Sequence, residues 1–176
     1  KPTQKSRRDF IKTGAVAAGS FMIVPRHVLG KGYIPPSDKL NIAAIGAGGK
    51  GWSDIRNAWN EGAENVVALC DVDTNRAKNA IEKFPKAKLY KDFRVMLEQQ
   101  KDIDAVTISG PDHMHGVAAM AAMQLGKHVY VQKPLTHNIY EARKLTEAAR
   151  QYKVVSQMGN QGASNPEQQL MVEWFN

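Results

Sequence analysis

Short apolar runs alternate with segments of helical periodicity along most of this chain, and this alternation limits its possible folds more than any other feature. The runs contain few polar residues, which is typical of strands in a parallel sheet that is covered on both faces. They lie at residues 42–45, 66–70, 88–90, 105–108, 129–131 and 154–155. Strands that alternate with helices in this way predict a doubly wound α/β domain.

The segments between the runs carry apolar residues at the spacing of amphipathic helices. The stripes are Trp52, Ile55 and Trp59; Ala77, Ile81 and Phe84; Val117, Ala121 and Leu125; and Ile139, Ala142, Leu145 and Ala149, with a further helix expected over residues 93–99. Asn138 followed by Glu141 is typical of a helix start, and Gly126 of a helix end.

The net charge of +7 suggests a nucleic-acid ligand only until its distribution is examined. Residues 1–39 hold eight of the 24 basic side chains and two of the 17 acidic ones, so the other 137 residues hold 16 basic and 15 acidic side chains. A nucleic-acid-binding domain needs a basic patch on the domain itself. We therefore expect no nucleic-acid partner.

The basic leader is similar to a bacterial twin-arginine export signal. Arg7 and Arg8 precede an apolar segment of 11 residues at positions 14–24, which is far shorter than the roughly 20 residues that span a bilayer. We expect a signal segment at residues 1–30, a linker at 31–38, transient contact with the translocase, a periplasmic or otherwise exported protein, and no stable membrane span. A plain basic tail before the first strand stays open as the alternative.

A glycine-rich motif, Gly46-Ala47-Gly48-Gly49-Lys50-Gly51, lies between the first predicted strand and the first predicted helix. In that context, Gly46 permits a tight turn, Gly48 lets a pyrophosphate approach the backbone, and Gly51 allows close packing of helix and strand. The helix N-terminus supplies free N–H groups for the anion. We therefore expect Gly46, Gly48, Gly49 and Gly51 to bind a dinucleotide.

Asp71 ends the second predicted strand, 20 residues after Gly51. A carboxylate at this point accepts hydrogen bonds from the adenosine ribose hydroxyls and repels a 2′-phosphate, so NAD is expected rather than NADP. Arg76 is close enough in sequence to weaken that preference. The alternative is that residues 71–73 only form a turn that caps a helix.

Polar residues also follow the later strands. Pro111, His113 and His115 follow the fourth strand, and Gln132, Lys133 and Pro134 follow the fifth. The carboxyl ends of parallel strands form the ligand crevice of such a sheet, so these residues are candidates for contact with the cofactor. Metal binding is not expected, because the two histidines have no evident partner and Cys70 is the only cysteine.

Lys133 is the candidate catalytic residue. A lysine held in a partly desolvated place beside an oxidised nicotinamide has a destabilised ammonium and exchanges a proton with a substrate hydroxyl. The alternative is a solvated lysine at the end of a strand.

In the order in which they occur, these motifs resemble the Gfo/Idh/MocA oxidoreductases, a family that includes glucose–fructose oxidoreductase and inositol dehydrogenase. The resemblance rests on the glycine motif, residues 70–73, residues 111–115, and residues 126–129 leading into Lys133-Pro134. It implies a Rossmann domain followed by an α/β substrate domain, a catalytic role for Lys133, a cis peptide before Pro134 and homo-oligomers. The family's motif has glutamate where this chain has Gln132.

The resemblance also implies an NAD(P)-dependent oxidoreductase that transfers a hydride to or from a sugar or polyol hydroxyl. Two other functions stay open, an NAD-dependent glycoside hydrolase with redox-neutral use of the cofactor and a module that only binds the cofactor. We assign residues 39–158 to the Rossmann domain and residues 159–176 to the start of the substrate domain. Asn165 and Pro166 are typical of a helix start, and the apolar Leu170, Met171, Trp174 and Phe175 that follow predict a continuation of the chain.

Overall fold

The computed structural model describes residues 35–175. The expected signal segment and residues 31–34 of the expected linker lie outside these residues. A short 3-10 helix, η1 (Pro36–Asp38), precedes a compact unit, Lys39–Asn176, in the chain. Within residues 35–175, no helix is both long and apolar enough to cross a bilayer.

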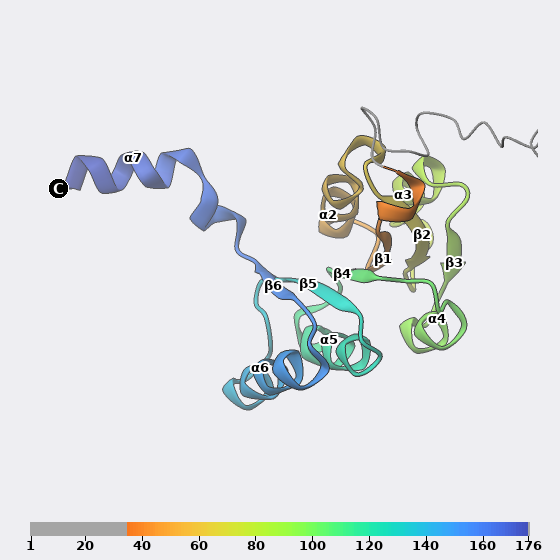
Figure 1. The fold of residues 1–176 in the computed structure, drawn as a ribbon. Coiled ribbons are helices and arrows are strands. Elements are labelled where there is room, and N and C mark those ends of the chain that lie inside the picture. The colour runs from red at the N-terminus through yellow and green to blue at the C-terminus, as the bar shows by residue number, and fades with distance from the viewer. Residues whose placement is uncertain (1–34, 176) are drawn as a thin grey trace, which may run out of the picture. The chain divides into compact units, whose positions relative to one another are not determined.

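The described part of the chain forms a six-stranded parallel sheet with the strand order β3-β2-β1-β4-β5-β6 (Figure 1). The strands are β1 (Asn41–Ile45), β2 (Asn65–Cys70), β3 (Lys88–Tyr90), β4 (Ala105–Ile108), β5 (His128–Gln132) and β6 (Ser156–Gly159). The chain moves outward from β1 to β3, then returns to β4 and moves outward the other way. The predicted doubly wound α/β fold is confirmed.

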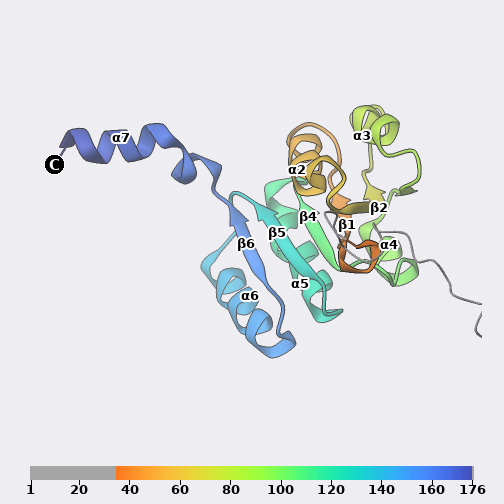
Figure 2. The same ribbon diagram turned by 45° about the horizontal axis from the view of Figure 1, so that its top comes forward.

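The connections between the parallel strands place helices on both faces of this sheet (Figure 2). One core contains residues of α2 (Lys50–Trp59) and α3 (Lys78–Lys83), such as Ile55 and Ala80. The other core contains residues of α4 (Phe93–Gln99), α5 (His115–Gln124) and α6 (Ile139–Tyr152), such as Met96, Ala118 and Leu145. The remaining elements are η2 (Asn60–Gly62), η3 (Asp112–Met114), η4 (Gln161–Ser164) and α7 (Pro166–Phe175).

The sixth strand was predicted two residues too early. Val154 packs into the core beside α5 and α6, and Val155 is exposed, whereas β6 pairs from Ser156, which lies opposite Val129 of β5. An edge strand makes its ladder with backbone groups and needs no apolar side chains, so the polar residues Ser156 and Gln157 gave no strand signal.

The apolar stripe predicted on α5 faces outward. Val117 and Leu125 are about half exposed, whereas Ala118, Ala119 and Ala122 are fully buried against the sheet. Nearly every side chain of α5 is apolar or small, so spacing alone does not select a face. The alanines face the sheet because their small side chains allow a close approach.

The start of α7 is confirmed at Pro166, after Asn165. The helix carries the exposed apolar side chains Leu170, Trp174 and Phe175.

Candidate cofactor-binding site

The glycine loop, residues 46–51, is built from backbone groups that lie too close together for side chains. Gly46 has a φ of 79°, and a Cβ on it would lie 2.7 Å from the Gly110 nitrogen. A Cβ on Gly51 would lie 1.6 Å from the Gly46 carbonyl oxygen, which no rearrangement of a side chain can relieve. The expected close packing of the first turn of α2 against the loop is therefore present. The loop follows β1 and packs against Ser109 and Gly110, which follow β4.

The helix α2 begins within this loop, at Lys50. Its N-cap, Gly49, has a φ of 55° and offers no side chain to the free N–H groups of the first turn. A Cβ on Gly48 would lie 2.8 Å from the backbone of Arg76, so Gly48 also lies in close backbone contact. Uncapped N–H groups at a helix N-terminus bind anions such as phosphate.

Asp71 lies beside the glycine loop, at the carboxyl end of β2. Its Oδ2 accepts a hydrogen bond from the Gly48 N–H at 2.9 Å, and its Oδ1 accepts one from the Asp73 N–H at 3.0 Å. Each carboxylate oxygen has two lone-pair directions, so the carboxylate keeps acceptor capacity for a ligand. A turn is also present, because Asp73 accepts hydrogen bonds from the N–H groups of Asn75 and Arg76. It does not cap α3, whose N-cap is Ala77 without a side-chain hydrogen bond.

Two adjoining cavities open at this edge of the sheet and share Gly46, Asp71, Val72, Gly110 and Pro111 as walls. The larger has a volume of about 530 Å³ and a partly polar lining. The smaller, of about 130 Å³, is almost entirely apolar. The polar wall is completed by Gly48, Lys50, Asp73, Arg76 and Ser109, and the apolar wall by Ile45, Cys70, Lys91, Phe93, Ile108, Met114 and Ala118.

Cys70 is part of the apolar wall and is almost fully buried. Burial, and then the nearby negative charges of Asp71 and Asp92, raise the pKa of its thiol to about 12. The thiol is therefore neutral and acts as a small apolar side chain.

The residues that follow β4 lie in different environments. Pro111 lines both cavities, and His113 is exposed on η3. His115 is only 1% exposed, and its ring nitrogens lie 2.7 Å from the Pro134 carbonyl oxygen and 2.9 Å from the Gly110 carbonyl oxygen. His115 therefore connects the segments that follow β4 and β5. Among residues 35–175, no group of three His, Cys, Asp or Glu side chains is arranged to hold a metal ion.

Lys133 follows β5 at the same edge of the sheet and is exposed. Its peptide bond to Pro134 is cis, as the resemblance implies. Its backbone N–H donates to the Oε1 of the buried Gln132 at 2.9 Å. The structure thus brings the glycine loop, Asp71 and Lys133 to the ends of neighbouring strands β2, β1, β4 and β5.

The sequence analysis missed Asp54, a buried carboxylate that is bonded to Gln132. Asp54, on α2, accepts hydrogen bonds from the Gln132 side-chain amide at 3.0 Å and from the Ser109 hydroxyl at 2.7 Å. A signal for Asp54 existed, because it falls three residues after Gly51 and one before Ile55, on the buried stripe of the helix. A charged residue on such a stripe needs partners. Nothing in the sequence indicates that Ser109 and Gln132 are those partners.

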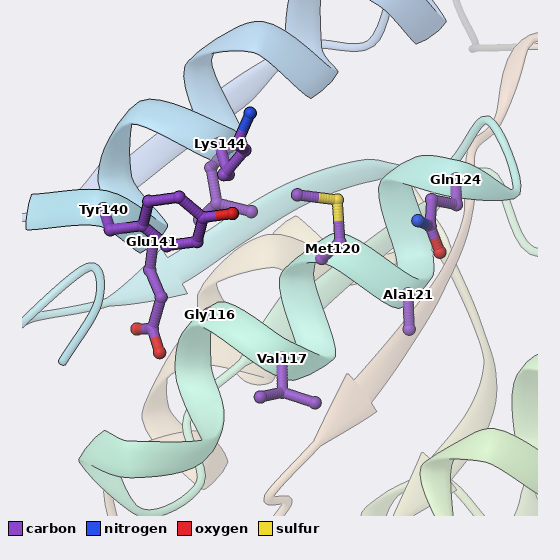
Figure 3. A pocket seen from close by; sticks show the side chains of 9 residues that line it. Gly116, Val117, Met120, Ala121, Gln124, Tyr140, Glu141 and Lys144 are labelled. Atoms are coloured by element: carbon purple, nitrogen blue, oxygen red, sulfur yellow. The ribbon is translucent and has the colours of Figure 1, made fainter. Parts of the chain in front are cut away.

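A third hollow of about 420 Å³ lies between α5 and α6 and shares no wall residue with the two cavities (Figure 3). Val117, Met120 and Ala121 of α5 and Tyr140 and Lys144 of α6 line it. The outward stripe of α5 forms one wall of this hollow.

Comparison with known protein families matches residues 40–160 to the family described as "Oxidoreductase family, NAD-binding Rossmann fold", with the short name GFO_IDH_MocA. The matched span contains the glycine loop, Asp71 and Lys133.

Glycosyl hydrolases and inositol dehydrogenases are both found among the similar curated proteins. A "Glycosyl hydrolase family 109 protein 1" of Shewanella sp. (strain ANA-3) is 29% identical over 168 residues, which cover 81% of this chain and 36% of the relative. An inositol 2-dehydrogenase of Salmonella typhimurium (strain LT2) is 32% identical over 112 residues, which cover 62% of this chain and 33% of the relative. The chain thus spans about a third of the length of these relatives.

Among solved structures, the WlbA dehydrogenase of Chromobacterium violaceum in complex with NADH and UDP-GlcNAcA is similar to this chain. The TM-score is 0.66 and the identity 25%, over 75% of this chain and 38% of that one. These comparisons agree with the Rossmann fold described above.

Proposed function

This chain belongs to the Gfo/Idh/MocA family of oxidoreductases with an NAD-binding Rossmann fold, and we propose that it is the cofactor-binding part of an enzyme that oxidises a sugar or polyol hydroxyl. The observation that carries the proposal is the position of Asp71, whose carboxylate is held beside the uncapped N-terminus of α2. The resulting wall offers N–H groups to phosphates and a carboxylate to ribose hydroxyls, and it adjoins an apolar cavity suited to a flat base.

The glycine loop fits a dinucleotide, because Gly49 places no side chain over the free N–H groups at the start of α2, and Gly46 and Gly48 line the larger cavity. Gly46, Gly48, Gly49 and Gly51 would bind the pyrophosphate, and Asp71 the adenosine ribose. When bound, the nicotinamide accepts or releases the hydride. Pro111, Gln132 and Pro134 stay candidates for contacts with the cofactor, together with His113 and His115.

Lys133 would handle the proton. In oxidation, the neutral amine of Lys133 takes the proton of the substrate hydroxyl while a hydride leaves the carbon that bears this hydroxyl, so an alcohol becomes a carbonyl. In reduction, the ammonium returns that proton to the carbonyl oxygen. Lys133→Ala in the longer enzyme should reduce kcat by about 100-fold or more, the usual contribution of general acid–base catalysis, with little change in Kd for NAD⁺. Undiminished turnover would exclude this role.

The preference for NAD over NADP is also part of the proposal. The carboxylate of Asp71 repels a 2′-phosphate, whereas Arg76, whose Nη2 lies 3.3 Å from the Cβ position of Gly49, would attract one. Thermal unfolding of this chain with each cofactor separates the two readings. At a hundredfold excess over Kd, the bound cofactor contributes about 2.7 kcal/mol and raises Tm by several degrees.

We expect a shift in Tm with NAD⁺ and none with NADP⁺. A shift with NADP⁺ alone would assign the selection to Arg76, and no shift with either would contradict the proposed site. Asp71→Ala should raise the Kd for NAD⁺ about 5- to 150-fold, the effect of losing about 1–3 kcal/mol of hydrogen bonding to a charged group. Asp102→Ala, at the opposite edge of the sheet, is the control.

A redox-neutral glycoside hydrolase is the second candidate, and the similarity to family 109 glycosyl hydrolases over 81% of the chain favours it. Net production of NADH from a sugar or polyol in the longer enzyme separates the two. A dehydrogenase accumulates NADH, whereas a hydrolase that restores its cofactor releases the aglycone without net NADH. Retained NAD⁺ affinity without turnover of either kind would leave a module that only binds the cofactor.

From the sequence, we also propose export through the twin-arginine route, which carries folded proteins and suits a protein that takes up its cofactor first. Residues 1–30 fused to a reporter should deliver it to the periplasm, and Arg7→Lys with Arg8→Lys should keep it inside the cell. Equal export of both fusions would contradict the proposal.

A further inference from the structure

Asp54 is a buried carboxylate that joins three separate segments of the site. Its Oδ1 pairs with the Lys50 ammonium at 2.6 Å, and its Oδ2 accepts from Ser109 at 2.7 Å and from Gln132 at 3.0 Å. These residues lie on α2, after β4 and at the end of β5. The Asp54 side chain is 3% exposed, so its charge depends on these partners rather than on water.

Gln132 is the part of this network that reaches Lys133. Its Nε2 donates to Asp54, and its Oε1 accepts from the Lys133 backbone N–H at 2.9 Å. One partner can only accept and the other can only donate, so the two together define the orientation of the amide. An alanine or another apolar residue at position 132 would break both bonds.

A glutamate at position 132 would not satisfy the same arrangement. It would place a second carboxylate oxygen at the 3.0 Å that separates Gln132 Nε2 from Asp54 Oδ2. Two carboxylates at that distance cannot both ionise, so the side chain at 132 would move away or one of the pair would take up a proton. The residue at position 132 therefore depends on the residue at position 54.

We propose that Asp54 is a positioning residue for Lys133 that acts through the side-chain amide of Gln132, and that glutamine occupies position 132 because a carboxylate occupies position 54. The catalytic consequence rests on the proposed function, whereas the pairing itself does not. Asp54 orients the Gln132 amide, the amide binds the Lys133 backbone N–H, and the position of that backbone sets where the Lys133 side chain begins.

The test uses hydrogen exchange at the Lys133 amide of the 176-residue chain, measured by NMR at one pH. Gln132→Glu should accelerate this exchange about tenfold, the factor that corresponds to ~1.4 kcal/mol and to the loss of one hydrogen bond. Asp54→Asn in the Gln132→Glu background restores one donor and one carboxylate with their positions exchanged. This double variant should exchange within about threefold of the parent chain.

Ser53→Ala is the matched control, because Ser53 shares Lys50 with Asp54 but makes no bond to Gln132. Its Lys133 amide should exchange at the parent rate. Exchange at the Ala44 amide, in the central strand, reports whether each variant is folded. If Gln132→Glu does not fold, recovery of the fold in the double variant supports the pairing. A double variant that does not fold, or that exchanges as fast as the single variant, overturns the proposal.

The longer enzyme adds a readout that structural damage alone would not produce. Gln132→Glu should lower kcat, and Asp54→Asn in that background should restore kcat. The hydrogen-exchange experiment needs neither cofactor nor turnover. Failure of the chain to bind NAD⁺ would therefore refute the proposed function, whereas the pairing of positions 54 and 132 would still be decided by exchange at the Lys133 amide. A kcat that does not recover, although exchange does, overturns the catalytic part of the inference.

Discussion

The two halves of the sheet edge that form the site are built in different ways. On the β1–β2 side, the glycine loop lies against neighbouring backbone, so closely that a single added carbon at Gly51 would collide with the Gly46 carbonyl. On the β4–β5 side, side chains make the connections. Asp54 holds Ser109 and Gln132, and His115 lies between the carbonyls of Gly110 and Pro134.

This difference teaches which changes each half can tolerate. A backbone-to-backbone contact has no side chain that can rearrange, so every added atom in the glycine loop is costly. A side-chain network accepts a substitution when its partner changes with it, because donors and acceptors can be exchanged. The four predictions below test this contrast.

The largest effect is expected from Gly51→Ala. The added Cβ would lie 1.6 Å from the Gly46 carbonyl oxygen, so the loop must open, and we expect a loss of about 3 kcal/mol or more of unfolding free energy together with NAD⁺ binding. Gly162→Ala is the control, because its Cβ meets nothing within 4 Å and should change stability by less than about 0.5 kcal/mol. Urea unfolding and calorimetry measure both. Normal NAD⁺ binding by Gly51→Ala would show that the loop can adjust.

His115→Ala tests the side-chain half. Removing the ring leaves the Gly110 and Pro134 carbonyls without this partner, and we expect a loss of about 2–4 kcal/mol of unfolding free energy. The exposed His113 is a control two residues away, and His113→Ala should change stability by less than about 0.5 kcal/mol. Equal effects of the two variants in urea unfolding would mean that His115 does not connect these segments.

A smaller effect is expected at the start of α6, the helix that follows the Lys133 segment. Asn138 Oδ1 accepts from the Glu141 N–H at 2.9 Å, while Glu141 Oε2 accepts from the His137 N–H. Asn138→Ala should therefore lower the unfolding free energy by about 1 kcal/mol, whereas Asn138→Asp should retain the cap. Thermal unfolding distinguishes them, and identical losses would exclude the capping role.

The smallest effect is expected at Cys70, which ends β2 on the β1–β2 side. Its thiol pKa is raised to about 12, so at pH 8 nearly all of it is the unreactive neutral form, and burial blocks access as well. Iodoacetamide should leave the folded chain unlabelled and label it fully in urea, with no change in Tm of the treated folded chain. Labelling of the folded chain at the rate of free cysteine would show that the apolar cavity opens.

Much of the β1–β2 side was predictable, because its features depend on residues that are close together in the sequence. The spacing of the glycines, the apolar runs and Asp71 at the end of a strand all report on neighbours along the chain, and the structure has the predicted strand and helix order. The helix start at Asn138 was predictable for the same reason, although the Glu141 side chain accepts from the His137 N–H rather than from the N–H of Asn138.

The other half could not be predicted in the same detail, because its partners are far apart in the chain. Asp54 and Gln132 are 78 positions apart, and His115 and Pro134 are 19 apart. Periodicity also predicted the wrong buried face for α5 and the wrong start for β6. An almost entirely apolar helix has no pattern that selects a face, and a polar edge strand has none that marks its start.

The sequence by itself determined the fold class, the strand order along the chain and the position of the glycine loop, since these depend on local propensity and on the spacing of small and apolar residues. Only the tertiary structure decided which buried carboxylate meets which amide and which face of α5 packs on the sheet. The physical reason is that hydrogen bonds between distant segments and the fit of side chains into a core exist only once the parallel strands have brought those segments together.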